Sequence, residues 1–129
     1  MIRVHSIPEY RFVVPGRAIS FRSPRARVYK RTVRNAARRV FSGPASNQKV
    51  NVFVDYFHTK PRRVDVDNVA KCILDALSGI AYVDDRQVRI QKAAAYSLQS
   101  IVHIFGGPVD LVKPLKTLRE YVFVRIRLS

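Results

Sequence analysis

The segment from Lys49 to Phe57 restricts the fold more than any other part of the sequence, because both faces of the strand it predicts are apolar. One face would carry Val50, Val52, Val54 and Tyr56, and the other Phe53 and Phe57. A strand that is apolar on both faces is typical of the interior of a sheet. The sequence therefore predicts a sheet in which this segment is a central strand.

The rest of the chain supplies the elements around that strand. Alternating apolar residues predict strands over 11–16, 88–98 and 121–128, and a 3.6-residue period predicts helices over 25–41 and 67–78. Gly79 follows the second helix, as is common at helix ends. The order β-α-β-α-β-β predicts an α+β (mixed α/β) fold, with one small domain over residues 1–129 and helices packed on a small mixed sheet. Residues 99–118 show no periodic pattern.

The predicted helix 25–41 has an apolar face and a cationic face. Tyr29, Val33, Ala36, Ala37 and Val40 recur at helical spacing and are expected to be buried. The cationic face is expected to contact phosphates, together with two arginines of the connector that follows the central strand. The predicted contact residues are Arg27, Lys30, Arg31, Arg34, Arg38, Arg62 and Arg63.

The overall charge predicts an acidic partner. Lys and Arg number 24 against nine Asp and Glu, a formal net charge of +15, and nucleic acid is the partner that such a balance favours most. No segment approaches the ~20 apolar residues needed to cross a bilayer, so no membrane partner is expected. The single cysteine, Cys72, and an N-terminus without an apolar signal core favour a reducing, cytoplasmic location.

Five of the nine acidic residues lie between residues 65 and 85, where Lys71 is the only base. A carboxylate cluster repels a polyanion unless something neutralises it. Divalent metal ions do so, and they also promote phosphodiester hydrolysis. Hard oxygen ligands of this kind suit Mg²⁺. This segment therefore predicts a metal-dependent nuclease, and its acidic residues are Asp65, Asp67, Asp75, Asp84 and Asp85.

The spacing of these carboxylates predicts a site. Asp65 and Asp67 are two residues apart where the chain enters a helix, so both can face the same ion. A helical hairpin would then return Asp85, with Asp84 beside it, to the side of Asp67. Lys71 lies one helical turn after Asp67, where its charge can stabilise the transition state or position the attacking water.

Structural interpretations of the same residues remain open. Asp65 or Asp67 can be the helix N-cap, with Asn68 sharing that role. Asp75 can pair with Lys71 or with a backbone amide, and Asp84–Asp85 can form an ordinary acidic turn. His58 precedes the cluster by a few residues and is either a structural side chain or a neighbour of the site.

The acidic segment resembles the core signature of the RusA family of Holliday junction resolvases. The matching residues are Asp65-Val66-Asp67-Asn68, Lys71, Asp75-Ala76-Leu77 and Asp84-Asp85-Arg86-Gln87-Val88. The resemblance implies a small homodimeric endonuclease that cuts four-way DNA junctions with Mg²⁺ or Mn²⁺, in a bacterial or phage-encoded, nucleoid-associated setting. It implies catalytic roles for Asp65, Asp67, Lys71 and Asp85, with Asp84 as a further metal ligand. It also implies that residues 99–118 are an insertion.

The combined prediction is a structure-selective endodeoxyribonuclease that resolves four-way junctions by paired, symmetric phosphodiester hydrolysis in recombination and repair. Two alternatives remain at this stage. The chain can be a basic nucleic-acid-binding protein without catalytic activity, because charge alone does not separate a binder from a nuclease. It can also be a related metal nuclease that acts on other branched DNA.

Overall fold

The computed structural model describes residues 8–59, 65–98 and 119–128. In these residues the chain forms β1 (Glu9–Pro15), α1 (Ala26–Arg38), β2 (Val50–His58), α2 (Val66–Leu77), a short 3-10 helix η1 (Asp85–Gln87), β3 (Val88–Ser97) and β4 (Tyr121–Leu128). The predicted α+β class and the order β-α-β-α-β-β are confirmed, with η1 added before the third strand. The assignment of residues 1–129 to a single domain stays a prediction.

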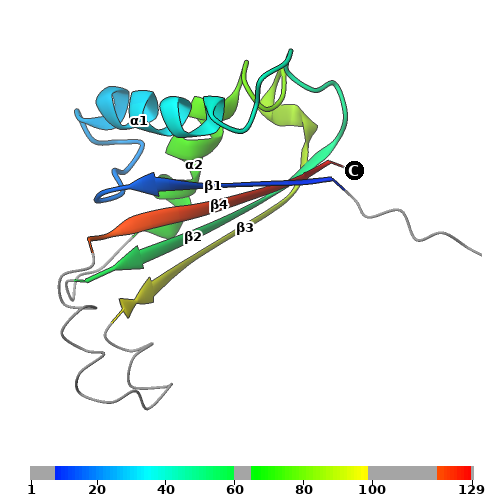
Figure 1. Cartoon of the computed structure of the whole chain (residues 1–129). Helices are drawn as coiled ribbons and strands as arrows, with labels where there is room; N and C mark the ends of the chain where they lie inside the picture. The colour runs from blue at the N-terminus through cyan, green and yellow to red at the C-terminus, as the bar shows by residue number, and fades with distance from the viewer. Residues whose placement is uncertain (1–7, 60–64, 99–118, 129) are drawn as a thin grey trace, which may run out of the picture.

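The four strands form one mixed sheet in the order β1-β4-β2-β3 (Figure 1). β1 and β2 both pair antiparallel with β4, whereas β2 and β3 are parallel. Parallel neighbours need a crossover between them, and α2 provides it. β2 has a partner on each side, which confirms its prediction as a central strand.

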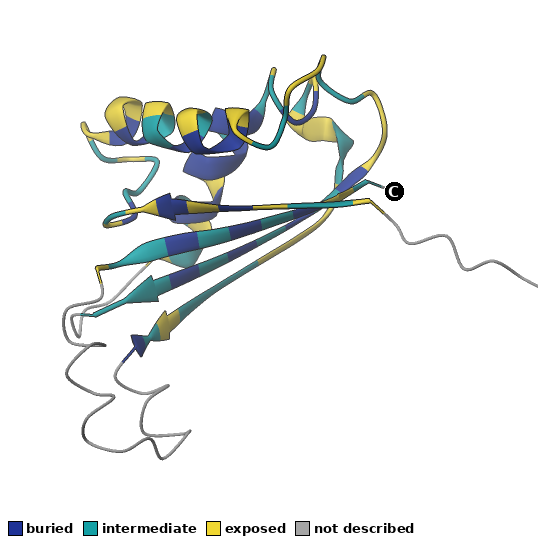
Figure 2. Ribbon diagram, in the orientation of Figure 1, coloured by how far each residue is buried: buried dark blue, intermediate teal, exposed yellow. Residues whose placement is uncertain are grey.

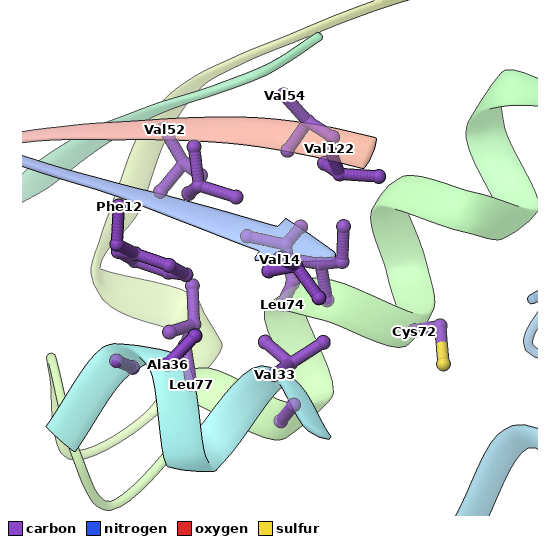
Figure 3. Close-up of a cluster of buried hydrophobic side chains, with 14 of the residues drawn as sticks. Phe12, Val14, Val33, Ala36, Val52, Val54, Cys72, Leu74, Leu77 and Val122 are labelled. Carbon is purple, nitrogen blue, oxygen red and sulfur yellow. The ribbon is translucent and has the colours of Figure 1, made fainter. Parts of the chain in front are cut away.

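Both helices cover the same face of the sheet, and the hydrophobic core lies between them and the strands (Figures 1 and 2). The inward residues of β2 are Val50, Val52, Val54 and Tyr56, and none is more than 1% exposed. Figure 3 shows side chains of both helices, such as Val33 and Leu74, packed with Val14 of β1 and Val122 of β4. Burial of this face explains why an apolar side chain occupies every inward position of β2.

α2 is buried over a wider arc than its sequence pattern predicts. Its helical period predicts a buried stripe of Val66, Val69, Ala70, Ile73, Ala76 and Leu77. Cys72 and Leu74 are buried in addition to this stripe, while Val66 is only partly buried. The cause is that α2 contacts both the sheet and α1: the Cys72 Sγ donates a hydrogen bond to the Ala26 carbonyl at 3.9 Å. Gly79 follows the helix with φ +88°, a left-handed conformation that favours glycine, as its position predicted.

The strand predicted over 88–98 is confirmed as β3, but two of its large apolar residues, Ile90 and Tyr96, do not face the core. The register shifts between Val50 and Asn51, so that Ile90 and Tyr96 lie beside Asn51 and Phe57 on the face that no described helix covers. Both are more than 40% exposed. This face is called the open face below.

Residues 99–118, Arg62 and Arg63 lie outside the described residues, so the predictions made for them stay predictions. Among the described residues, no helix is long and apolar enough to cross a membrane.

Candidate active site

Asp65 is the N-cap of α2. Its Oδ1 accepts a hydrogen bond from the Asn68 backbone N–H at 3.2 Å, and its Oδ2 accepts one from the Asn68 side-chain amide at 2.8 Å. The capping interpretation of Asp65 is thus confirmed, whereas Asn68 donates both hydrogen bonds to this cap and does not share the capping role. Capping leaves lone pairs on both oxygens, so the carboxylate keeps the capacity to bind a cation.

Asp67 lies in the first turn of α2 and is exposed. Within the described part of the chain its carboxylate makes no hydrogen bond or ion pair to another side chain. Lys71, one turn further, is also exposed, and its Nζ lies 4.3 Å from the centre of the Phe21 ring. The Phe21 backbone N–H donates to the Asn68 carbonyl at 3.0 Å, which holds this ring against the start of α2. Asp67 and Lys71 are therefore both presented to solvent from a fixed helix end.

Asp75 pairs with α1 and not with Lys71. Its Oδ2 lies 3.3 Å from the Lys30 Nζ, and the pair is partly buried. The prediction that Lys71 or a backbone amide is the partner was wrong, because the helix-helix contact brings in a cation from another element. This ion pair leaves Lys71 without an acidic partner among the described residues.

The second acidic segment caps η1. The Asp84 Oδ1 accepts a hydrogen bond from the Arg86 backbone N–H at 2.9 Å, and the Asp84 backbone N–H donates to the Gln87 Oε1, also at 2.9 Å. The Arg86 backbone and side-chain hydrogen bonds hold the pKa of Asp84 below its usual range. Asp85 is exposed in the only turn of η1.

Gln87 fixes this segment to the entrance of β2. Its Nε2 donates to the Ser46 carbonyl at 2.7 Å and to the Gln48 carbonyl at 2.8 Å. Sequence reasoning gave Gln87 no role beyond its match to the signature. The structure shows that it both closes the capping box and sets the position of Asp84 and Asp85.

The two acidic segments lie at opposite ends of α2 within one chain. A helix of 12 residues is about 18 Å long. Asp85 begins η1, which leads directly into β3, and the start of β3 pairs with the start of β2, whereas Asp65 follows the end of β2. The described residues contain no group of three or more His, Cys, Asp or Glu that can hold a metal ion. The expectation that a hairpin returns Asp85 to Asp67 was therefore wrong for a single chain, because the chain leaves α2 at its far end.

Asp67 lines a groove of ≈ 550 Å³ that sequence reasoning did not find. The groove also contains Asp55 of β2, which lies 4.0 Å from the Arg125 guanidinium. In the sequence, Asp55 could have been found because it is the one acidic residue within the apolar pattern of β2. The remaining residues of the groove come from β2 and β3: Phe53, Gln91, Lys92, Ala93, Ala94 and Tyr96.

The cations of α1 divide into two groups. Arg27, Arg31 and Arg38 are exposed. Lys30 and Arg34 face α2 instead, where Lys30 pairs with Asp75 and the Arg34 Nε donates to the Ala76 carbonyl at 3.2 Å. The exposed group keeps its predicted role in contacting phosphates, and the second group also holds α1 against α2.

His58 ends β2, and its ring centre lies 5.7 Å from that of Tyr56.

The geometry defines a class of protein: a small α+β domain in a strongly cationic chain, with exposed carboxylates at two helix starts. A model of the RusA endodeoxyribonuclease family matches residues 8–104, and the chain therefore belongs to that family, whose members resolve Holliday junctions. The match includes both acidic segments. No curated protein gives a significant match.

Proposed function

We propose that this chain is a metal-dependent endodeoxyribonuclease that resolves four-way DNA junctions as a homodimer, by paired, symmetric hydrolysis during recombination and repair. The observation that carries the proposal is the acidic signature inside the family match, with Asp67 and Asp85 each exposed beside a capping aspartate. We further propose a cytoplasmic, nucleoid-associated location.

The donor chemistry fits Mg²⁺ or Mn²⁺, since carboxylate oxygens are hard ligands. Asp65, Asp67, Asp84 and Asp85 would hold the ion or ions. A bound ion supplies polarisation of the phosphate and a lower pKa for the attacking water. Lys71 contributes a positive charge near Asp67, which stabilises charge developing on the phosphate.

A two-fold axis offers a way to unite the two acidic segments. Within one chain they are separated by the length of α2, about 18 Å. In a symmetric dimer, opposite ends of equivalent elements can meet, so that Asp67 of one protomer lies beside Asp85 of the partner subunit. Two such composite sites would be related by the axis, as paired nicks in a junction with approximate two-fold symmetry require.

The exposed cations of α1 support binding to the DNA backbone. Arg27, Arg31 and Arg38 lie on a helix that has no acidic residue. Contacts of this kind are largely independent of sequence and weaken steeply as salt rises. Such backbone contacts suit an enzyme that recognises its DNA substrate by its branched shape and not by its base sequence.

The test is cleavage of a labelled synthetic four-way junction in Mg²⁺ or in EDTA, with the products mapped on a denaturing gel. Symmetric nicks in opposing strands that need the metal are the expected result. The Asp67→Asn variant should lose cleavage but bind the junction as tightly or more tightly, because a negative charge is removed. Wild-type cleavage by this variant would refute the site.

Flap, fork and linear duplex substrates at equal concentration separate junction resolution from cleavage of other branched DNA. Binding of the junction without nicks in either buffer would instead identify a non-catalytic DNA-binding protein.

A further inference from the structure

The open face of the sheet carries a row of stacked aromatic rings. Tyr121 of β4, Phe57 of β2 and Tyr96 of β3 are neighbours across the strands. The centres of the Phe57 and Tyr121 rings are 4.9 Å apart with 23° between their planes, and those of Phe57 and Tyr96 are 5.3 Å apart with 24°. Because both helices cover the other face, this row is separate from the hydrophobic core (Figure 1).

The row ends at an edge of the sheet, at Tyr96, which is 42% exposed. Tyr96 lines the same groove as Asp67. Two cations, Lys92 and Arg125, also line it, and Asp55 lies 4.0 Å from the Arg125 guanidinium, where it offsets part of that charge. An exposed ring, cations and a proposed metal ligand therefore meet in one groove.

These features together match the chemistry of an unpaired nucleotide. An aromatic side chain stacks on any base, while lysine or arginine beside it contacts the phosphate. A base inside a duplex offers no free face for such stacking. A branched substrate contains unpaired or easily unpaired bases at its branch point, next to the phosphates that are cut.

We propose that an unpaired nucleotide adjacent to the cleaved phosphate binds in this groove, with its base stacked on Tyr96 and its phosphate near Lys92 and Arg125. The location of the cleaved phosphate rests on the proposed function of Asp67. Binding of the nucleotide itself needs neither metal nor catalysis.

Charge favours DNA over a second copy of this chain as the occupant. The open face carries four cations, Arg11, Lys92, Arg125 and Arg127, against Glu9 and Asp55. Packing two such faces together would bring like charges into a poorly solvated interface, whereas a DNA strand brings compensating phosphates.

The test uses the full chain in the Asp67→Asn background, with EDTA present, and two fluorescent probes: a single-stranded oligodeoxynucleotide and the matching blunt duplex. Tyr96→Ala is expected to weaken binding of the single strand about tenfold, with little change for the duplex. Tyr96→Phe keeps the ring and should bind both probes as the background does. Val13→Ala, on the same face but on β1 at the opposite edge, is the matched control and should leave both affinities unchanged.

An equal loss of affinity for both probes, or no loss for the single strand, would overturn the proposal. So would dissociation of a dimer by Tyr96→Ala in sedimentation, since the face would then be a protein interface. If Tyr96→Ala fails to fold, the Asp67→Asn protein with Tyr96 intact is photocrosslinked to a single-stranded oligonucleotide that contains 5-iododeoxyuridine. A crosslink at Tyr96 supports the site, and crosslinks confined to α1 refute it.

The two proposals can fail separately. If the protein cuts junctions with metal but Tyr96→Ala does not selectively weaken single-strand binding, only the proposed nucleotide site is refuted. If Tyr96→Ala selectively weakens single-strand binding but the protein cuts no DNA, only the proposed nuclease activity is refuted.

Discussion

The acidic segments at the two ends of α2 share one local arrangement but cap very different helices. At each end one aspartate caps a helix and a neighbouring aspartate in the first turn is exposed: Asp65 with Asp67, and Asp84 with Asp85. At the first end the capped helix has 12 residues and belongs to the core. At the second end it has three residues and is held by Gln87 to the segment before β2.

This comparison shows what a cap can and cannot determine. A cap fixes the backbone around it, and so it orients the neighbouring carboxylate at each end. The distance between the ends is fixed by α2 itself. In the proposed homodimer a second chain brings the two pairs of carboxylates into one site, and the first prediction tests this arrangement.

The largest effect is expected from mixing two inactive variants. Asp67→Asn and Asp85→Asn should each abolish cleavage alone. If the sites are composite, a mixed dimer keeps one intact site, so random reassembly should restore about a quarter of wild-type nicking. The readout is strand nicking of a labelled junction after the two proteins are denatured and refolded together. Mixtures that stay inactive would show that each site lies within one chain.

The second-largest effect is expected on the cleavage rate, where Lys71 beside Asp67 should matter more than Arg86 beside Asp84. Lys71→Met keeps a side chain that packs on Phe21 but removes the charge, and it should slow single-turnover cleavage on the order of 10²-fold. Arg86→Ala removes an exposed partner of Asp84 and should change the rate little. Equal losses in the two variants would mean that Lys71 has no special role in the chemistry.

The capping aspartates should differ in their effect on stability. Asp65→Ala removes the cap of α2 and should lower the free energy of unfolding by about 1 kcal/mol, measured by urea denaturation. Asp65→Asn should restore most of that stability because asparagine also caps helices, yet it should not restore full metal-dependent cleavage. Asp84→Ala should cost less than Asp65→Ala, since η1 has only three residues.

The smallest effect concerns pH. Hydrogen bonds from Arg86 lower the pKa of Asp84, so this carboxylate binds its proton less readily in the folded chain than in the unfolded chain. Its stabilising contribution is thus complete above the unfolded pKa and is lost as the pH falls through the folded pKa. Carboxyl NMR titration should show the Asp84 midpoint rising in Arg86→Ala. An unchanged midpoint would exclude the Arg86 side chain as a cause and leave its backbone N–H, which the substitution keeps.

Local periodicity was sufficient to predict most elements of the fold. The two-faced pattern of β2, the apolar side of α1 and the glycine after α2 all depend on neighbours within a few residues. The structure confirms them except at Val40, which lies beyond the end of α1 and is only partly buried. The insertion of β4 between β1 and β2 depends on pairing between distant segments, and no local pattern encodes it. Burial of Cys72 was missed for the same reason, because it follows from the contact with α1.

The candidate site was predictable as a set of residues but not as a geometry. The signature identified Asp65, Asp67, Asp84 and Asp85, and capping preference identified one role of Asp65. The separation of the two pairs follows from where the chain enters β3, which spacing along the sequence does not reveal. Asp75 was assigned a partner on its own helix, whereas Lys30 on α1 reaches it across the helix-helix contact.

The position of β4 has a consequence for synthesis of the protein on the ribosome. Of the four strands that the structure describes, the one that pairs with both β1 and β2 is the last to be translated, so each of those strands has an unpaired edge until residues 121–128 emerge. A nascent chain that stalls earlier exposes a hydrophobic central strand and is prone to aggregation through that edge. The sheet can therefore close only after translation has passed residue 128, and pausing before β4 should make the chain dependent on chaperones.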